Sequence, residues 1–358
     1  MSLNSTPEPA GSTTPLWSDP LREAAFGQWL ASLAAAQGLH TGSLRIASAD
    51  ASFRRYLRID SVAGSRIIMD APPDKEDCRP FVKVAQLMHE AGLLVPKVLA
   101  WDEPMGFMLL SDLGTQTMMQ AIDPAQPQAN LGLYLQAVDA LVAWQTASKP
   151  DVLPLCDQAL LTRELALFPE WYLSRHRGLT LDATQQGTLD AAFAAIMAQN
   201  LAWSRVYVHR DFMPRNLMVA GDLLGVLDFQ DAVYGPITYD VASLMRDAFL
   251  SWDEDFCLDI TVRYWERARR AGLPVGDDFG EFYRGVEWMG LQRHLKVAGI
   301  FARLTLRDGK PQYLAETPRF LGYIRATCSR YRELKPLLRL LDQVEGVAAP
   351  SGYAFGRV

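Results

Sequence analysis

Four polar residues that could carry out chemistry lie in the stretch VYVHRDFMPRNLMVAGDLLGVLDFQD, which covers residues 206–231. His209 and Asp211 follow one apolar run, Asn216 begins a second and Asp228 ends a third. Polar side chains at the ends of buried strands are costly unless they are paired or bind a cation. Asn216 and Asp228 offer the oxygen ligands that Mg²⁺ prefers, which leaves Asp211 to accept a proton or orient a hydroxyl. Together these groups could transfer a phosphoryl group from ATP to an alcohol.

The residues before this stretch predict a small unit of strands and one main helix. Asp19 and Pro20 are typical of a helix start, and apolar residues follow them at helical spacing. The runs SLRIAS, FRRYLRID and SRIIMDAP have the character of strands. A helix is expected in EDCRPFVKVAQLMHEAGL, followed by a strand pair, KVLAWDE and FMLLSDLG, that turns at residues 104–106.

From about residue 115 onward the apolar residues recur at helical spacing, as in LGLYLQAVDALVAWQTA and DITVRYWERARRAG. The stretch over 206–231 is the β-rich exception among these helices. We therefore expect an α+β fold with a disordered tail over 1–18, a small antiparallel-sheet lobe over 19–112 and a larger helical lobe over 113–358.

The composition indicates an ordinary globular protein and excludes several classes. The 358 residues are 49% hydrophobic, which allows a sizeable core. The net charge of -6, with scattered basic residues, disfavours a nucleic-acid partner. The four cysteines lie far apart, which indicates neither a zinc site nor a disulfide framework. Because no apolar run approaches ~20 residues, no membrane contact is expected, and a cytoplasmic protein without an obligate protein partner is the simplest interpretation.

The motif over 206–231 resembles that of a known fold. HRDFMPRN resembles the kinase catalytic loop H-x-D-x-x-x-x-N, and LDFQD resembles the metal-binding DFG element of the protein-kinase-like fold. The phrase DFQDAVYGPITYDVASLMRD is similar to the aminoglycoside phosphotransferase and choline kinase group, since no APE-type segment follows. The resemblance implies that Asp211 is the catalytic base, that Asn216 and Asp228 are Mg²⁺ ligands and that His209 supports the loop. It also implies that Asp240 braces the loop, whereas local chemistry alone equally favours a helix N-cap there.

The phosphate-binding part departs from the pattern of protein kinases. The loop ASADASFRRY has no glycine, although its small residues and the hydroxyl of Ser52 would allow phosphates to approach. The third strand reads IIMD, without the Lys that the family usually has. We expect Arg54 or Arg55 to bind phosphate in its place, with Lys75 as a third choice. Solvated arginines on an edge strand are the alternative.

The run FMLLSDLG resembles the hinge of the same fold. The resemblance implies that backbone groups of Ser111, Asp112 and Leu113 hold the adenine edge of ATP. A plain buried strand that ends in a Gly turn would leave the same pattern. No Walker A sequence occurs, which disfavours a P-loop enzyme.

Several phrases narrow the acceptor. DASFRRY, MDAPPDKEDCRPF, VPKVLAWD, DFQDAVYGP and LQRHLKVAGIFARL resemble the anomeric N-acetylmuramate/N-acetylglucosamine kinases of bacterial cell-wall recycling, over roughly residues 22–340. The resemblance implies an ATP- and Mg²⁺-dependent sugar kinase that acts on the C1 hydroxyl. Aminoglycosides are polycations and favour acidic pockets, whereas the muramate carboxylate favours cations. The candidate sugar contacts are Arg163, Trp171, His176, Arg246 and Arg293.

Two other functions stay open at this point. An aminoglycoside or other small amino-alcohol kinase would use the same catalytic residues. A non-catalytic, nucleotide-binding pseudokinase is the second alternative, because the third-strand Lys and the loop glycines are missing. The presence of Asp211, Asn216 and Asp228 argues against a pseudokinase.

Overall fold

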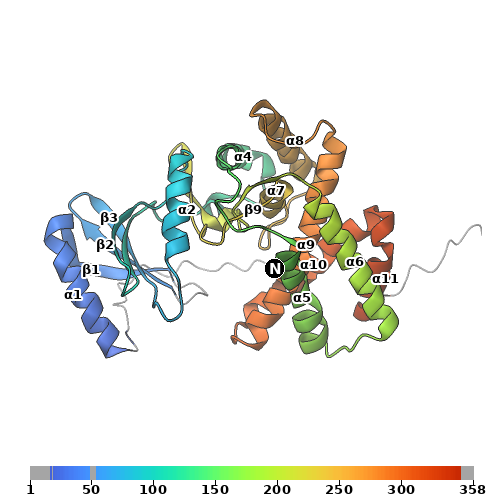
Figure 1. The fold of residues 1–358 in the computed structure, drawn as a ribbon, viewed down its shortest axis with the longest axis horizontal. Coiled ribbons are helices and arrows are strands. Elements are labelled where there is room, and N and C mark those ends of the chain that lie inside the picture. Colours follow the sequence, from blue (N-terminus) through green and yellow to red (C-terminus); the bar gives the residue numbers. More distant parts are fainter. Residues whose placement is uncertain (1–16, 18, 49–53, 348–358) are drawn as a thin grey trace, which may run out of the picture. The chain divides into compact units, whose positions relative to one another are not determined.

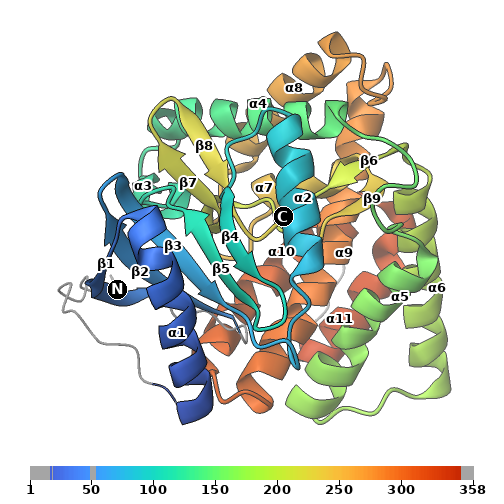
Figure 2. The same cartoon turned by 60° about the vertical axis from the view of Figure 1, so that its left-hand side comes forward.

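The computed structural model describes residues 17, 19–48 and 54–347, so the expected tail over 1–18, apart from residue 17, and Ser52 lie outside the described residues. The fold is α+β, as the sequence predicts, with an antiparallel sheet toward the N-terminus and a mostly helical remainder (Figures 1 and 2). The contacts divide the chain into two units. The sheet unit holds the described residues up to Gln116 together with Met218–Gln230, and the helical unit holds the rest. The boundary at residue 113 stays a prediction.

The sheet unit is built on an antiparallel sheet and two helices. Their bounds are α1 Pro20–Gln37, β1 Leu39–Ser48, β2 Arg55–Ser61, β3 Gly64–Asp70, α2 Arg79–Glu90, β4 Val98–Asp102 and β5 Phe107–Ser111. The strands pair in the order β1-β2-β3-β5-β4. Asp19 caps α1 by accepting from two backbone N–H groups, as expected for an Asp-Pro start. Phe26 and Leu30 of α1 pack with Ile68 and Phe107 of the sheet. Helix α1 lies beside strands β1 to β3 (Figure 1).

A hairpin far along the sequence belongs to the sheet unit. Its strands are β7 Leu217–Ala220 and β8 Leu223–Val226. The N–H of Val219 donates to the carbonyl of Gln116 at 2.9 Å, and the N–H of Val226 donates to the carbonyl of Leu94 at 2.8 Å. These bonds join the hairpin to the sheet unit. Asp228, which follows β8, is therefore positioned by this unit and not by the helices that surround it in sequence.

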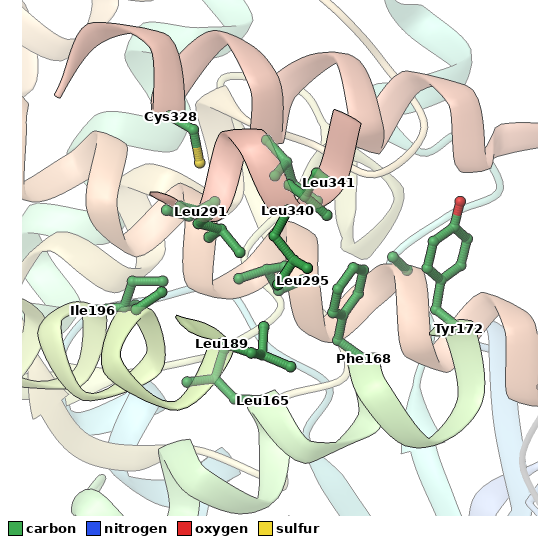
Figure 3. Packing of buried hydrophobic residues seen from close by; sticks show 14 of the residues in the cluster. Leu165, Phe168, Tyr172, Leu189, Ile196, Leu291, Leu295, Cys328, Leu340 and Leu341 are labelled. Carbon is green, nitrogen blue, oxygen red and sulfur yellow. The ribbon is translucent and has the colours of Figure 1, made fainter. Parts of the chain in front are cut away.

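The helical unit holds most of the remaining elements. Their bounds are α3 Met118–Ala121, α4 Leu131–Thr146, α5 Gln158–Leu167, α6 Ala183–Leu201, β6 Arg205–Val208, β9 Val233–Pro236, α7 Thr238–Met245, α8 Glu254–Arg270, α9 Phe279–Leu306, α10 Thr317–Arg330 and α11 Lys335–Glu345. Strand β6 pairs antiparallel with β9. Figure 3 shows a core in which Leu291 and Leu295 of α9 pack with Leu165, Leu189 and Leu340 from three other helices.

Helix α9 organises the helical unit because it lies against α5, α6, α7 and α10. Its residues between 285 and 302 are buried almost throughout. A Cβ at Gly299 would collide with the backbone of Leu167 at the end of α5, so only glycine allows this close approach. The approach brings the polar side chains of α9 next to α5 and α7, where they meet the loop that follows β6.

Candidate functional site

The loop that follows β6 is held by a carboxylate from α7. Asp240 accepts hydrogen bonds from the backbone N–H of His209 at 2.7 Å and of Arg210 at 2.9 Å. Asp240 is fully buried and is the third residue of α7, whose N-cap is Ile237, so a simple helix cap does not describe it. Buried backbone donors need acceptors, and Asp240 supplies two. It thus fixes the direction in which the loop leaves the strand.

Arg210 adopts a backbone conformation that favours glycine. Its φ is 78°, in the left-handed region. Such a residue costs about 1–3 kcal/mol and persists only where its surroundings hold it. The carbonyl of Arg210 accepts from the hydroxyl of Ser243 at 3.1 Å and from the guanidinium of Arg293. With Asp240 on its N–H, the Arg210 backbone is held from both sides, so the position of Asp211 is fixed.

Asp211 presents a charged carboxylate. Its side chain is 38% exposed, and its Oδ1 lies 3.7 Å from Nη2 of Arg293. Burial raises the pKa of Asp211, but the charges of Lys296, Arg293 and other nearby cations lower the pKa more, to a net value below its ordinary range. Its N–H donates to Nδ1 of His209 at 3.2 Å, which ties that ring to the loop. At neutral pH Asp211 is ionised and can accept a hydrogen bond from a hydroxyl.

A buried set of charges lies behind the loop. Glu164 of α5 accepts from Nη2 of Arg210 at 2.7 Å and from Nζ of Lys296 at 3.1 Å. Burial raises the pKa of Glu164, but Lys296 and Arg210 lower it below its usual range. Tyr239 lies within 3.4 Å of both Glu164 and Lys296. The sequence analysis missed Glu164 and Tyr239; its one usable signal was that Arg293 and Lys296 are three residues apart on one helix.

The two expected Mg²⁺ ligands lie in different units. Asn216 ends the 3₁₀ turn Pro214–Asn216 of the helical unit, and its Nδ2 donates to the carbonyl of Asp211 at 2.9 Å. Asp228, in the sheet unit, has a φ of 61°, and its Oδ1 accepts from Nε2 of Gln230 at 2.8 Å. The amide nitrogen of Asn216 serves the loop, so its amide oxygen is the atom suited to a metal. Carboxylate and amide oxygens are the ligand types that fit Mg²⁺.

The third strand carries an acid where the family usually has a base. Asp70 at the end of β3 is fully buried and accepts from Arg22 of α1 and from Arg55 of β2. The guanidinium of Arg55 also lies 3.9 Å from the ring centre of Trp17. Removing one partner from a buried ion pair leaves an uncompensated charge, which is strongly destabilising. Arg55 is therefore engaged inside the sheet unit.

Arg54 points to a different partner. Its Nη2 lies 2.9 Å from Oε2 of Glu76, and both side chains are mostly buried. Burial lowers the pKa of Arg54, but Tyr56, Glu76 and other acidic groups, Asp228 among them, raise it above its ordinary value. Lys75 is half exposed and lies 3.4 Å from Asp74. The charge of Asp228 thus acts on the guanidinium of Arg54.

The expected hinge residues, 111–113, are held by another arginine of the sheet unit, Arg58. Arg58 of β2 donates to Asp112 at 2.6 and 3.1 Å and to the carbonyl of Gly114 at 2.7 Å. Burial raises the pKa of Asp112, but hydrogen bonds from Arg58 and Gly114 lower it to a net value below its ordinary range. Ser111 exchanges two hydrogen bonds with the backbone of Lys97. Leu113 lies against Gly225, where a Cβ would come within 2.7 Å. The backbone from 111 to 114 is thus fixed in shape.

The five candidate sugar contacts are spread over the helical unit. Arg293 contacts Arg210 and Asp211 in the loop that follows β6. Arg163 is exposed on α5, and Arg246 binds Glu254 at 3.2 Å. Trp171 is buried in the core with a guanidinium 4.0 Å from its ring centre, and the ring of His176 lies 5.5 Å from that of Tyr172. The structure therefore brings Arg293 together with Asp211. The other four candidates each lie in different surroundings.

Asp247, which follows α7, is a buried acid that the sequence analysis did not single out. It is 1% exposed, and its Oδ1 accepts from the N–H of Phe249 at 2.9 Å. No group among the described residues hydrogen-bonds to its Oδ2. Burial raises the pKa of Asp247 to about 6, although Phe249 and Arg293 favour the charged form. At neutral pH, Asp247 is thus an ionised carboxylate in a buried environment that disfavours its charge.

Asp247→Asn is expected to change the pH dependence of stability. The folded pKa lies above the unfolded value of about 3.9, so the contribution of Asp247 is full below about pH 4 and is lost as pH rises through about 6. Asn cannot ionise. From pH 4.5 to 7.5 the variant should therefore gain about 2 kcal/mol relative to the wild type, at about 1.4 kcal/mol per pKa unit, because part of the difference is already present at pH 4.5. Urea unfolding at both pH values measures this gain.

The control for this comparison is Asp342→Asn, whose carboxylate is half-buried and accepts from Arg325 at 2.9 Å. Losing this partly exposed ion pair should cost at most about 1 kcal/mol of stability. An equal stability difference for Asp247→Asn at the two pH values would show that Asp247 does not titrate between them.

An antiparallel-sheet unit, followed by a helical unit whose H-x-D loop is braced by a buried Asp, defines a protein-kinase-like phosphotransferase. The family comparison agrees, because residues 43–275 match the phosphotransferase enzyme family. The chain belongs to this family. It is 50% identical over 305 residues to the N-acetylmuramate/N-acetylglucosamine kinase of Neisseria meningitidis, with 85% of this chain and 91% of the relative covered. It is 49% identical to the enzyme of the same name from Pseudomonas aeruginosa, over 82% of this chain and 86% of the relative.

Solved structures support the fold. A choline/ethanolamine kinase family protein from Mesorhizobium loti has a TM-score of 0.60 at 15% identity, covering 90% of this chain and 99% of that one. The GDP complex of aminoglycoside 2'-phosphotransferase-IIIa has a TM-score of 0.59 at 13% identity, covering 86% and 99%. At these identities the likeness shows the fold alone. Of the helices that are described, none has the length and apolar character needed to span a membrane.

Proposed function

We propose that this protein is an ATP- and Mg²⁺-dependent kinase that phosphorylates the anomeric C1 hydroxyl of N-acetylmuramate, N-acetylglucosamine or both, in the cytoplasm, during peptidoglycan recycling. The observation that carries the proposal is the ionised, partly exposed carboxylate of Asp211 on a loop held from both sides. The relatives named for this activity, at 47–50% identity over most of the chain, support the choice of acceptor.

The charge state of Asp211 suits an anomeric hydroxyl. The ring oxygen of the sugar withdraws electrons from C1, so the hydroxyl there is more acidic than an ordinary alcohol. A carboxylate with a lowered pKa is a weak base, and it orients such a hydroxyl and receives its proton late in the transfer. Phosphoryl transfer relies mainly on positioning and on charge stabilisation, so a held and ionised Asp211 is sufficient.

We propose that Asn216 and Asp228 hold Mg²⁺ through their side-chain oxygens, as the resemblance to the kinase motif implies and as suits this ion's preference for oxygen ligands. When bound, Mg²⁺ would neutralise phosphate charge. Ser111, Asp112 and Leu113 would present backbone groups to the adenine edge, with Arg58 keeping that backbone in place. The residues that we propose to bind ATP therefore lie at strand ends and in loops. A nucleotide and a small sugar are the only binding partners that we propose.

Arg54→Gln is expected to raise KM for ATP. We propose that Arg54 is the cation that binds the phosphates of ATP, because Glu76 orients its guanidinium and the charge of Asp228 helps to raise its pKa. A charge-assisted hydrogen bond contributes about 1.5–3 kcal/mol, so its loss should raise KM for ATP by roughly 10- to 100-fold. Steady-state kinetics with ATP varied at saturating sugar measure this change.

The neighbouring substitution Arg55→Gln is the matched comparison, because it removes one partner of the buried Asp70. It should lower the urea midpoint of unfolding and leave KM for ATP within about threefold of the wild type, a difference below about 1 kcal/mol. If Arg55→Gln raised KM for ATP and Arg54→Gln did not, the two arginines would have to exchange roles.

A panel of acceptors tests the proposed function. Purified protein with saturating ATP and MgCl₂ is offered N-acetylmuramate, N-acetylglucosamine, kanamycin and choline, and phosphorus NMR identifies the phosphorylated position. We expect a 1-phosphate of one or both sugars. Turnover of kanamycin or choline with inert sugars would favour an amino-alcohol kinase. ATP binding without any transfer would favour a pseudokinase.

A further inference from the structure

Arg293 of α9 faces the catalytic loop and not solvent. It is 2% exposed. Its Nη1 donates to the carbonyl of Arg210, and its Nη2 lies 3.7 Å from Oδ1 of Asp211. The centre of its guanidinium lies 5.3 Å from the centre of the Tyr239 ring. A sugar contact, which the sequence indicated for Arg293, would need a side chain that reaches solvent, and Arg293 instead reaches the backbone of the loop.

The two contacts of Arg293 are neighbours along the chain. The carbonyl of Arg210 belongs to the peptide that leads directly into Asp211. One rigid guanidinium therefore holds that peptide and the carboxylate that follows it in one geometry. Because Arg210 has a φ of 78°, this peptide is the strained point of the loop and has the most to gain from a charged donor.

The side chain of Arg210 is tied to the same helix. Arg210 binds Glu164 at 2.7 Å, and Glu164 also accepts from Lys296, which lies three residues after Arg293 on α9. Arg293 and Lys296 thus hold residue 210 at its carbonyl and, through Glu164, at its guanidinium. Buried cations are costly without partners, so two of them on one side of α9 indicate a specific task.

We propose that Arg293 is a positioning residue that acts through Arg210 and Asp211 and does not contact the sugar. The proposal rests on the proposed function, in which Asp211 receives the proton of the acceptor. It follows that loss of Arg293 impairs the transfer step and leaves the binding of both substrates intact.

Arg293→Gln tests the proposal through kcat and KM separately. Small misplacements of a reacting group can cost about 10²-fold, so kcat should fall by roughly 10- to 100-fold while KM for the sugar and for ATP stays within about threefold. Arg293→Lys keeps the charge and one donor, and should recover part of kcat. A large rise in KM for the sugar with unchanged kcat would show direct contact and overturn the proposal.

Arg267→Gln is the matched control. Nη1 of Arg267 also donates to a backbone carbonyl, that of Leu135 at 3.1 Å, and to an aspartate, Asp139, but on α4. Because its ion pair with Asp139 is largely exposed, Arg267→Gln should lose at most about 1 kcal/mol of stability and keep its kcat. An equal loss of kcat in both variants would show a general effect of a missing arginine and would overturn the proposal.

A double-mutant cycle asks whether Arg293 acts through Asp211. In an Asp211→Asn background, adding Arg293→Gln should lower the residual rate by less than about twofold, because residues that act as one unit are not additive. A full further loss would mean that Arg293 acts on its own.

Amide hydrogen exchange gives a readout without turnover, which separates this inference from the proposed function. Residues 209–216 should exchange faster in Arg293→Gln than in the wild type, while segments away from the loop keep their rates. Unchanged exchange in this loop would overturn the inference even if the sugar kinase activity stands. A wild type that phosphorylates no sugar, with faster exchange in the variant, would overturn the function alone.

Discussion

Asp211→Ala is expected to lower kcat for sugar phosphorylation by about 10²- to 10⁴-fold, the usual contribution of a positioned general base. The carboxylate is ionised by the cations around it and is 38% exposed, so it can meet an acceptor hydroxyl. The methyl group of Ala cannot accept a hydrogen bond. ATP binding, measured by calorimetry, should stay within about threefold, because the proposed phosphate and adenine contacts involve other residues.

Two controls make the Asp211 result specific. Asp222→Ala removes an exposed acid between β7 and β8 and should leave kcat unchanged. Asp211→Asn keeps the shape and one acceptor oxygen, so a comparable loss would assign the effect to the negative charge. Turnover by Asp211→Ala within about tenfold of the wild type would remove Asp211 from the role of base, since a base contributes at least about 10²-fold.

The loop that carries His209, Asp211 and Asn216 could be predicted from the sequence because its parts are close in the chain. His209, Asp211 and Asn216 lie within eight residues, and an apolar strand followed by polar groups is a local signal. The α1 start at Asp19 and Pro20 was predicted for the same reason, and the cap confirms it. Local signals of this kind depend on hydrogen bonds within one turn of the backbone.

The charges behind the loop could not be predicted, because their partners are far apart in the chain. Glu164 and Lys296 are 132 residues apart, and Arg22 and Asp70 are 48 apart. No periodicity in the sequence marks such pairs, because a charged residue that is paired in the core has the same local sequence pattern as one on a solvated helix or strand. The sequence therefore offered Arg293 as a sugar contact, and only its burial against Arg210 changes that interpretation.

The position of the β7–β8 hairpin was also beyond the sequence pattern. The chain passes from the helical unit into the sheet unit at Met218 and returns at Asp231. The apolar runs showed that strands were present, but strand pairing depends on hydrogen bonds to Leu94 and Gln116, more than 100 residues earlier. A motif that is continuous in sequence is thus divided between two units.

Asp240→Ala is expected to cost about 2–6 kcal/mol of stability and most of the activity. The N–H groups of His209 and Arg210 would both lose their acceptor while buried, at about 1–3 kcal/mol each. Asp240→Asn keeps one acceptor oxygen and should lose less. Burial raises the pKa of Asp240 to about 6, although the charge of His209 and the hydrogen bonds from the backbone N–H groups of His209 and Arg210 act to lower this pKa. The wild type's advantage over Asn is therefore full below about pH 4 and shrinks as pH rises through about 6.

Urea unfolding at pH 5 and pH 8, together with kcat at pH 8, measures these effects. Asp278→Ala is the control for the competing interpretation of Asp240 as a helix cap, since Asp278 caps α9 by accepting from the N–H of Glu281 at 3.0 Å. An ordinary cap costs about 1 kcal/mol, so a similar loss in both variants would reduce Asp240 to that role. A larger loss in Asp240→Ala, accompanied by loss of kcat, requires that the carboxylate holds the catalytic loop. The strained Arg210 lies between its two supports, and without Asp240 the bonds from Ser243 and Arg293 hold only its carbonyl side.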